Sequence, residues 1–295
     1  MSTATLAGRS AIVTGASQGL GREIAQRFLA AGANVALCAR TAADVEAVTV
    51  ALRTDFPDQK VVAQTCDVAD TGEIDSMFDS VLAAFGGFDI VVNNAGVHGP
   101  IGQIGEIDWA AWQQAIAVNL LGAAYCCHRA VKHFKERGPS PPRGKIINLS
   151  DGGATAPQPG ISAYGASKAG LVRFTETLAA EVRPFGIDVN AVAPGALATR
   201  LMTELNAAGP ERIGADQHAL VKEMVAQGGM SMARAADLCV YLASSASDGI
   251  TGRLISAAWD PWPFTPDRGR ELMASDIYTL RRITERDRGL DWGDK

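Results

Sequence analysis

Short apolar runs alternate with longer amphipathic runs along most of this 295-residue chain, and this alternation constrains the fold more than any other feature. The short runs are almost continuously apolar, which is typical of strands that are covered on both faces. The longer runs repeat their apolar residues with helical spacing. Strands joined by helical crossovers pair in parallel with right-handed connections, so the sequence predicts an α/β fold built on a doubly wound, Rossmann-like parallel sheet.

The pattern assigns most of the chain to individual elements. The expected strands are Ser10–Thr14, Ala33–Ala39, Lys60–Thr65, Phe88–Val92, Lys145–Leu149, Ile187–Val192 and Arg253–Ser256. The expected helices are Leu20–Ala31, Ala42–Asp55, Thr71–Phe85, Trp109–Arg137, Ala163–Arg183 and Ala233–Ser244. The fourth helix is expected to end at Gly138, before the proline-rich loop Pro139–Pro142. Because ligands of such sheets bind at the carboxyl ends of the strands, functional residues are expected there.

An expected single domain covers residues 1–258, and two segments of the chain interrupt the alternation. Residues 197–232 form an insertion rich in alanine, methionine and glycine, which we interpret as a substrate loop or mobile lid, with packing helices as the alternative. Residues 259–295 form an extension in which Trp259, Trp262 and Phe264 lie among prolines, followed by a charged segment with a helical pattern, Asp267–Arg288. The extension is expected to cap the substrate cleft of its own or a neighbouring subunit, or to dock at an oligomer interface.

Composition excludes several classes of function. The net charge of −5 is unsuited to nucleic acid or anionic membranes, and no run of about 18 apolar residues could span a bilayer. The N-terminus lacks the pattern of a signal peptide, and the cysteines lack a C-x-x-C spacing, so a cytoplasmic protein with reduced thiols is expected. No metal site is expected, because Cys126, Cys127 and His128 are consecutive and cannot face one ion from a helix.

A glycine-rich segment, Thr14–Gly21, follows the first expected strand and opens the first helix. Small residues let the backbone approach a pyrophosphate closely, and the start of a helix offers free N–H groups and a positive dipole end. The spacing is G-x-x-x-G-x-G, and its position after the first strand of an α/β chain predicts a dinucleotide site. The residues expected to form it are Gly15, Ser17, Gln18, Gly19, Leu20 and Gly21.

The end of the second strand bears on which dinucleotide is bound. An NAD site usually places a carboxylate here for the ribose 2′-hydroxyl. This chain has Ala39 followed by Arg40, and a guanidinium suits a 2′-phosphate. We therefore expect NADP, with NAD as the alternative. In the other interpretation, Arg40 is a solvated loop residue.

The next two strands end in residues that suit the remainder of the cofactor. Asp67, followed by Val68, could accept a hydrogen bond from an adenine amino group, or it could be a carboxylate at the start of a helix. Asn94, Ala95 and Gly96 end the fourth strand. Small residues there leave room for a flat ligand, while asparagine side chains can tie neighbouring loops together.

Together these residues resemble the classical short-chain dehydrogenase/reductase family, over roughly residues 6–257. The motifs occur in the family's order: Thr14–Gly21, Asp67, Asn93–Gly96, Asn119, Tyr164–Lys168, Pro194-Gly195 and Thr199. The resemblance implies a nicotinamide cofactor and a homotetramer or homodimer. It also implies that Pro194, Gly195 and Thr199 line the nicotinamide, that Lys168 holds the nicotinamide ribose, and that Asn119 binds a water linking Lys168 to solvent.

Tyr164 and Lys168 are four residues apart, so both lie on one face of the expected helix. Carbonyl reduction needs a hydride donor and a group that protonates the oxygen. A tyrosine suits the second task when its pKa, about 10, is lowered toward the working pH, and a nearby ammonium favours the phenolate. The pair therefore predicts acid–base chemistry beside a nicotinamide, with a surface pair as the alternative.

One position departs from the family pattern. The usual serine, thirteen residues before the tyrosine, is Asp151 here, and Ser150 precedes it. Three accounts stay open. A neutral Asp151 could donate to the substrate oxygen. An ionised Asp151 could pair with a cationic or polyhydroxylated substrate while it disfavours the phenolate. Alternatively Ser150 could replace the serine, because Gly152-Gly153 makes a backbone shift inexpensive. Ser162 is a weaker candidate and is expected to cap a helix.

The primary interpretation is an NADP-preferring oxidoreductase that acts on a secondary alcohol or ketone. Asp151 favours a small-molecule substrate that is hydroxylated, sugar-like or amine-bearing over a steroid or lipid. A dehydratase or epimerase on the same frame is one alternative. A non-catalytic nucleotide-binding sensor is another, which the intact Tyr164, Lys168 and Asn119 disfavour.

Overall fold

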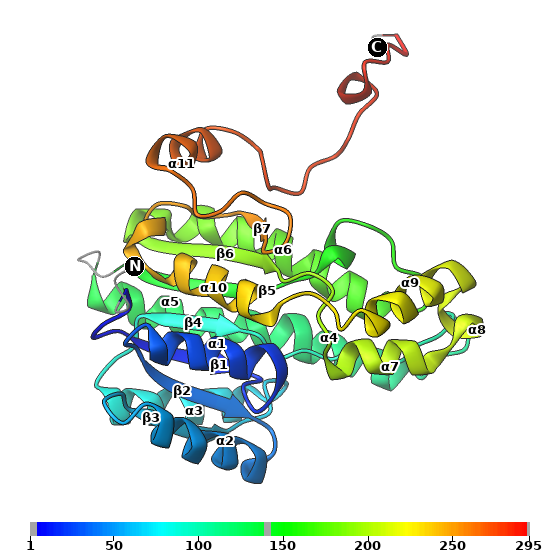
Figure 1. The fold of residues 1–295 in the computed structure, drawn as a ribbon. Helices are drawn as coiled ribbons and strands as arrows, with labels where there is room; N and C mark the ends of the chain where they lie inside the picture. The colour runs from blue at the N-terminus through cyan, green and yellow to red at the C-terminus, as the bar shows by residue number, and fades with distance from the viewer. Residues whose placement is uncertain (1–4, 139–142, 294–295) are drawn as a thin grey trace.

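A seven-stranded, entirely parallel sheet runs through the centre of the protein (Figure 1) in this computed structural model, which describes residues 5–138 and 143–293. The strand order is β3-β2-β1-β4-β5-β6-β7. The strands are β1 Ser10–Thr14, β2 Asn34–Ala39, β3 Val61–Thr65, β4 Ile90–Asn93, β5 Gly144–Leu149, β6 Ile187–Ala193 and β7 Leu254–Ser256. The chain adds β2 and β3 on one side of β1 and then adds β4 on its other side. A ligand cleft is expected at this switch point between β1 and β4. The predicted fold class is confirmed.

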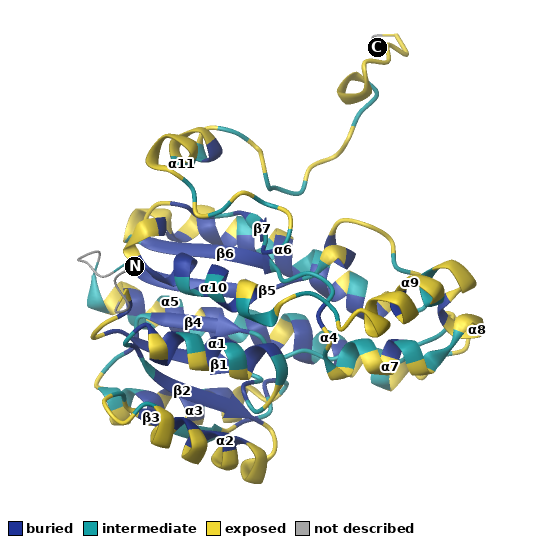
Figure 2. Ribbon diagram, viewed as in Figure 1, coloured by how far each residue is buried: buried dark blue, intermediate teal, exposed yellow. Residues whose placement is uncertain are grey.

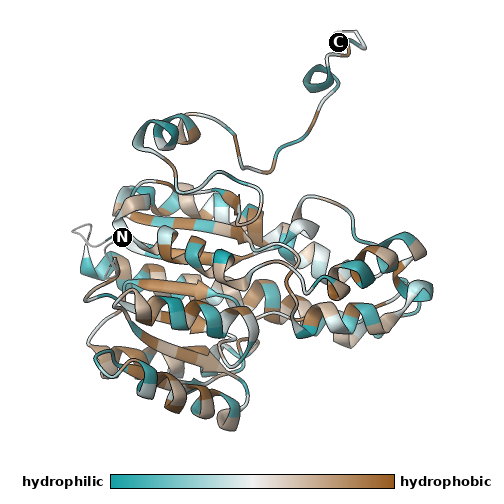
Figure 3. Ribbon diagram, viewed as in Figure 1, coloured by the Kyte–Doolittle hydropathy of each residue, from teal (hydrophilic) through white to brown (hydrophobic). Residues whose placement is uncertain are grey.

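Helices cover both faces of the sheet, so the strands are buried on both sides (Figure 2). One face packs against α1 Gly19–Ala30, α2 Ala42–Asp55 and α10 Met232–Ala243. The other packs against α3 Thr71–Phe85, α5 Ala123–Arg137 and α6 Ser162–Val182. In β1, Ala11 and Val13 point into the first layer and Ile12 into the second. This two-sided burial explains the continuous apolar runs, which colour the strands brown in Figure 3.

The helix expected over Trp109–Arg137 is interrupted, so that prediction is wrong in its middle. It consists of α4 Trp109–Ile116, a π-helical segment Ala117–Gly122, and α5. The segment lies against the chain after β3, since a Cβ atom on Gly122 would come within 2.2 Å of the Val68 carbonyl oxygen. The wider turn carries Asn119 at its centre.

The insertion at residues 197–232 folds into three short helices beside the end of the sheet (Figure 1): α7 Arg200–Ala208, α8 Pro210–Ile213 and α9 Ala215–Ala226. They share a small core of Leu205, Ile213 and Val221, which contacts Ile161 and Tyr164. The insertion therefore touches the region of the expected catalytic tyrosine, and its opening and closing stay a prediction.

The C-terminal extension packs along β7 and α6. Its one longer helix is α11, Pro266–Met273, so the helical pattern expected over Asp267–Arg288 is wrong beyond Met273, apart from a single 3₁₀ turn at Arg286–Arg288. The backbone carbonyls after Met273 bond to the main body instead of within a helix. Arg253 donates to the Ser275 and Ile277 carbonyls, and the Leu254 N–H donates to the Tyr278 carbonyl. The last described residues, from about 281, extend away from the body (Figure 1).

The sequence analysis also made predictions about membrane spans, metal sites and cysteines. No helix within residues 5–138 and 143–293 is long and apolar enough to cross a membrane. The same residues contain no group of three or more histidine, cysteine or acidic side chains arranged to hold a metal ion. All five cysteines are free and buried. The loop expected at Pro139–Pro142 lies outside the described residues.

Candidate active site

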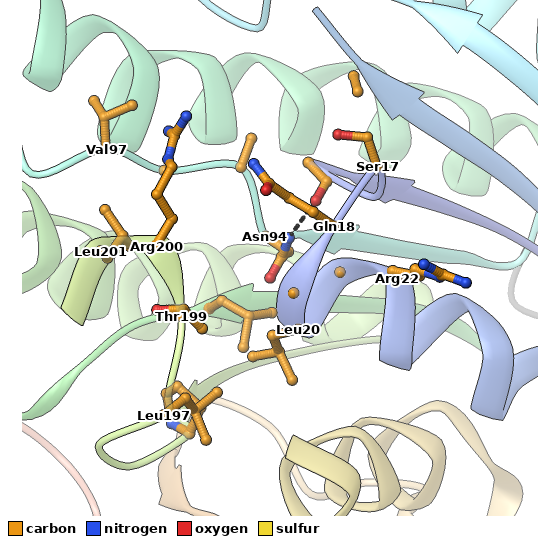
Figure 4. A pocket seen from close by; sticks show the side chains of 18 of the residues that line it. Ser17, Gln18, Leu20, Arg22, Asn94, Val97, Leu197, Thr199, Arg200 and Leu201 are labelled. Carbon is orange, nitrogen blue, oxygen red and sulfur yellow. Dashed lines mark hydrogen bonds between the residues drawn. The ribbon is translucent and has the colours of Figure 1, made fainter. Parts of the chain in front are cut away.

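A cleft of about 780 Å³ opens at the carboxyl ends of the strands (Figure 4), where the doubly wound sheet was expected to bind a ligand. It brings together every predicted site residue except Asn119. These residues are Gly15, Ser17, Gln18, Gly19, Leu20, Gly21, Arg40, Asp67, Val68, Asn94, Ala95, Gly96, Ser150, Asp151, Tyr164, Lys168, Pro194, Gly195 and Thr199. Their roles stay predictions, and their placement in one cleft is an observation.

The glycine-rich loop is locked to the end of β4 by Asn94. The Asn94 side-chain amide donates to the carbonyls of Thr14 and Gly15, at 2.9 and 3.1 Å. A Cβ atom on Gly21 would lie 2.3 Å from the Gly15 carbonyl oxygen, and one on Gly15 would lie 2.8 Å from the Ala95 Cα. The glycines thus allow the loop to fold tightly against itself and against β4. The prediction that an asparagine ties these loops together is confirmed.

The start of α1 has the free donors that a pyrophosphate needs. Gln18, at the N-cap, makes no side-chain capping bond, and the first turn contains no acidic residue. A Cβ atom on Gly19 would meet nothing nearer than the Thr199 methyl group, at 3.8 Å. In Figure 4 the α1 loop with Ser17, Gln18 and Leu20 lies across from Thr199 and Leu201. These residues fit a dinucleotide diphosphate held between the α1 N-terminus and the insertion.

Charged side chains from α1 and from the segments after β2 and β3 also line the cleft. Arg40 and Arg22 both line the cleft, as does Asp44. Asp67 also lines it, and one of its oxygens accepts from the Ala69 N–H at 3.0 Å. The alternative that Asp67 caps a helix is wrong, because Asp70 caps α3 through the N–H groups of Gly72 and Glu73.

Tyr164 and Lys168 lie in the first half of α6, and both are buried. The Lys168 Nζ is 5.5 Å from the centroid of the Tyr164 ring. It donates to the Leu149 carbonyl at the end of β5, at 2.7 Å. Burial lowers the pKa of Lys168 to about 8, against an opposing effect of Asp151. A lysine held in this way carries its positive charge beside the tyrosine near neutral pH.

Tyr164 differs from the expectation of a lowered pKa. Burial raises its pKa well above the usual range, and the charge of Asp151 and a hydrogen-bonding interaction with that carboxylate raise it further. The expectation considered Lys168 alone, whereas desolvation and a neighbouring anion both favour the neutral phenol. The tyrosine of this structure is therefore in its proton-donating form.

Asp151 and Ser150 both line the cleft, but their side chains have different partners. One Asp151 oxygen accepts from the Gly153 N–H at 2.8 Å, which fixes the carboxylate just after β5. The Ser150 hydroxyl is buried and donates to the Lys168 carbonyl at 3.4 Å. Ser162 accepts from the Trp112 indole at 3.1 Å and caps no helix, since Ile161 is the N-cap of α6. Of the three side chains, Asp151 is the one that interacts with Tyr164.

Asn119 lies behind the cleft. Its side-chain oxygen accepts from the Val97 N–H at 2.9 Å, and its nitrogen donates to the Val97 carbonyl and the Ser167 hydroxyl, at 2.8 and 3.0 Å. A Cβ atom on Gly96 would lie 3.4 Å from the Asn119 oxygen and 3.5 Å from the Lys168 Nζ. The Asn119 side chain thus anchors the chain after β4, and the expected water relay stays a prediction.

Several lining residues were missed by the sequence analysis. His98 lies just after the Asn93–Gly96 motif, and its side chain type was the only available signal. Arg200, Met202 and Leu205 come from α7, where no motif spacing marks individual positions. Arg22 lies one residue beyond the glycine-rich segment, on α1.

Comparison with known proteins identifies the family. A sequence profile described as "short chain dehydrogenase" matches residues 9–209, more than half of the chain. The chain belongs to the short-chain dehydrogenase/reductase family. It is an enzyme, an oxidoreductase of the class that acts on alcohols and ketones with a nicotinamide cofactor.

Three short-chain dehydrogenase/reductase relatives illustrate the range of similarity. A 3beta-hydroxysteroid dehydrogenase of Eggerthella lenta is 40% identical over 68% of this chain and 74% of its own. An L-fucose dehydrogenase of Oryctolagus cuniculus is 32% identical over 83% of this chain and 82% of its own. A solved structure of 3-ketoacyl-(acyl-carrier-protein) reductase from Brucella melitensis, complexed with NADH, is 27% identical with a TM-score of 0.74, over 85% of this chain and 97% of that one.

Proposed function

We propose that this enzyme is an NADP-preferring reductase and dehydrogenase that interconverts a small polar ketone and its secondary alcohol. The observation that carries the proposal is the neutral, buried Tyr164 beside Lys168, at one end of a cleft whose other end is the glycine-rich loop. The cofactor supplies hydride to the carbonyl carbon in reduction and accepts it in oxidation. The protein's own residues bind, orient and transfer the proton.

The cofactor would be held along the length of the cleft. The α1 N-terminus and the loop of Gly15, Ser17 and Gly19 suit the diphosphate. Arg40 follows the uncharged end of β2, and with Arg22 it supplies guanidinium groups for a 2′-phosphate. Asp67 suits the adenine amino group, and Pro194, Gly195 and Thr199 suit the nicotinamide. This set of residues supports NADP over NAD.

Tyr164 transfers the proton at the substrate oxygen. In reduction its neutral phenol donates to the oxygen as negative charge develops there. In oxidation the same hydroxyl group must first lose its proton. Because burial and Asp151 both raise the Tyr164 pKa, reduction is the direction that the resting charge state supports near neutral pH.

Asp151 acts as a carboxylate that keeps the neighbouring Tyr164 in its protonated form, rather than as a copy of the family's serine. Its negative charge holds the phenol neutral and also supports the ammonium of Lys168. Lys168 in turn offsets the carboxylate and is close enough to the ring to stabilise charge on the tyrosine oxygen. Of the three accounts of this position, the ionised Asp151 has the most support.

The substrate end of the cleft combines apolar and polar walls. Met202 and Leu205 of α7 contribute apolar surface, while Asp151 and His98 contribute polar atoms. The relatives are named for one apolar substrate, a hydroxysteroid, and one polar substrate, L-fucose. The carboxylate at position 151 favours a hydroxylated or amine-bearing substrate. We also propose that the enzyme is a homotetramer or homodimer and that it is located in the cytoplasm.

The test is a coupled assay of nicotinamide absorbance with a panel of ketones, sugars and amino alcohols, with NADPH and NADH in parallel. Turnover that is faster with NADPH is expected. Arg40→Ala should lower kcat/KM with NADPH by about tenfold or more, the size of a charge-assisted hydrogen bond, and leave NADH nearly unaffected. Faster turnover with NADH in the wild-type enzyme would contradict the cofactor preference, and no turnover with any pair would contradict the function.

A further inference from the structure

His98 lies at the substrate end of the cleft, and the proposed chemistry does not use it. Its side chain is only 7% exposed. Its ring lies edge-on to the Tyr164 ring, with 4.9 Å between centroids. The Nδ1 atom is buried and has no hydrogen-bond partner among the described residues. Because buried polar atoms are nearly always hydrogen-bonded, an unpartnered nitrogen in a cleft wall indicates a partner that a ligand provides.

The backbone on both sides holds His98 in place. On one side, Val97 exchanges two hydrogen bonds with Asn119, at 2.9 and 2.8 Å. On the other side, Gly99 has a φ of +74°, and a Cβ atom there would lie 2.7 Å from the Ala115 Cβ, so the turn requires glycine. The imidazole is therefore presented from a fixed position, as a residue that selects a substrate must be.

The charges around His98 define what it can bind. Burial lowers its pKa to about 4, with Asp151 opposing and Lys168 adding to this effect, so the ring is neutral near pH 7. A neutral imidazole has one donor and one acceptor nitrogen. The Glu204 carboxylate of α7 approaches Nδ1 at 3.9 Å, which is too far for a direct hydrogen bond. A small polar group about 2.8 Å from each atom would bridge this gap.

We propose that His98 and Glu204 select the substrate by binding, between Nδ1 and the Glu204 carboxylate, a hydroxyl or ammonium group on the carbon next to the reacting one. In the proposed function Tyr164 binds the reacting oxygen, and its ring contacts His98, so we place the second polar group on the carbon next to the reacting one. A hydroxyl donates to Glu204 and accepts from Nδ1–H, and an ammonium donates to both. The substrate class is thus a vicinal diol or amino alcohol, or the matching ketone. This inference rests on the proposed function.

The insertion brings the two halves of this subsite together. His98 belongs to the loop after β4, whereas Glu204 lies on α7, where Arg200 pairs with it at 3.2 Å. Glu204 is partly exposed, so a substrate group can reach its carboxylate from the cleft side. A substrate without the second polar group leaves Nδ1 unpartnered, and this is the physical basis of the discrimination.

The experiment measures oxidation of three matched alcohols: butan-2-ol, propane-1,2-diol and 1-amino-2-propanol. They differ in the group beside the carbinol, which is methyl, hydroxyl or ammonium. The readout is the ratio of kcat/KM for each polar alcohol to that for butan-2-ol. A ratio of about tenfold or more is expected for at least one polar alcohol in the wild-type enzyme, because a polar site rejects an analogue that lacks the polar group.

The variants identify the atoms responsible. His98→Leu should bring the ratio near one. His98→Asn, whose amide lies near the position of Nδ1, should restore much of it, and His98→Gln, whose amide lies near Nε2, should not. Glu204→Gln should lower the ratio for the amino alcohol more than for the diol, because it removes the charge and keeps an oxygen. Glu211→Gln, on an exposed carboxylate of α8, is the matched control and should keep both ratios.

The outcomes separate this inference from the proposed function. If all three alcohols are oxidised but the wild-type ratios are near one, or His98→Leu keeps them, hydride transfer stands and the inference is wrong. If no alcohol is oxidised, the proposed function fails for these substrates. The same ratios are then measured as dissociation constants in protein saturated with NADP⁺, where equal binding of the diol, the amino alcohol and butan-2-ol would overturn the inference independently.

Discussion

Asp151 is the residue at which this enzyme departs most from its family's pattern, and its charge acts on three neighbours. Burial is the larger influence on each: it raises the pKa of Tyr164 and lowers those of Lys168 and His98. Asp151 adds to the effect on Tyr164 and opposes the effect on the other two. At neutral pH the result is a neutral Tyr164 phenol, which can donate a proton.

Asp151→Asn is expected to shift the pH profile of alcohol oxidation. The carboxylate raises the Tyr164 pKa, so removing its charge lowers that pKa, and the phenolate needed for oxidation forms at lower pH. The rising limb of kcat/KM against pH should therefore move to lower pH. An unchanged limb, with the variant folded and binding NADP⁺, would mean that Asp151 is not charged in the working enzyme.

Lys168 should impose a second pH dependence, on the reductive reaction. Its pKa of about 8 means that the ammonium beside Tyr164 is lost as the pH rises through that value. Reductive kcat/KM is expected to fall above about pH 8. Lys168→Arg, whose guanidinium stays charged, should be less active yet lack this limb. If the arginine variant keeps the same limb, another group is responsible.

At the scale of elements, the glycine-rich loop, β4 and α1 form one interlocked unit through Asn94 and the contact between Gly15 and Gly21. The sequence predicted the glycines for their approach to a phosphate. The structure adds that Gly21 is needed for packing within the protein. The loop that we propose to hold the cofactor is thus itself fixed by the neighbouring strand.

Gly21→Ala is expected to weaken cofactor binding and lower stability. Alanine favours a helix over glycine by about 1 kcal/mol, but overpacking against a backbone atom costs about 1–3 kcal/mol, so the clash at 2.3 Å should win. Denaturant unfolding and NADPH titration measure the two effects. Gly105→Ala is the control, because a Cβ there meets nothing within 4 Å. Equal behaviour of the two variants would contradict this packing role.

The elements differ in how far the sequence determined them. Strands such as β1 and β6 were predicted to within a residue because burial on both faces leaves a continuous apolar run. The π-helical segment was not predictable from local spacing, and it includes Gly122, which lies against the distant Val68. The site followed the same division. The position of Tyr164 and Lys168 on one helix followed from their local spacing, whereas the raised Tyr164 pKa depends on burial and Asp151.

At the scale of the whole molecule, the extension divides into two parts. Residues up to about 280 belong to the body: Trp262, Phe264 and Tyr278 pack against its core, and Leu280 against β7 and α6. Beyond them, Ile283, Leu290 and Trp292 are apolar and well exposed. No residue of the extension lines the cleft, so the expectation that it caps its own subunit's cleft is not met by the described residues. Contact with a neighbouring subunit stays a prediction.

Two truncations separate these parts. Removing residues 281–295 should leave unfolding and catalysis nearly unchanged, because none of these residues belongs to the core clusters. It should weaken assembly, because it removes the exposed apolar Ile283, Leu290 and Trp292. Removing residues 259–295 should destabilise the subunit itself, because it uncovers Tyr241 and empties the aromatic cluster around it. Light scattering and denaturant unfolding give the two readouts. An unaltered oligomeric state after the shorter truncation would contradict an interface role for the last residues.

The most direct test of the account is single-turnover reduction by wild-type enzyme and Tyr164→Phe, loaded with NADPH and mixed with the best ketone of the panel. The change removes one hydroxyl from a buried ring, so NADPH affinity and the fold should be retained. Loss of the general acid should slow hydride transfer by about 10²–10⁴-fold. A decrease of less than about tenfold, with NADPH binding intact, would contradict the central claim that Tyr164 delivers the proton.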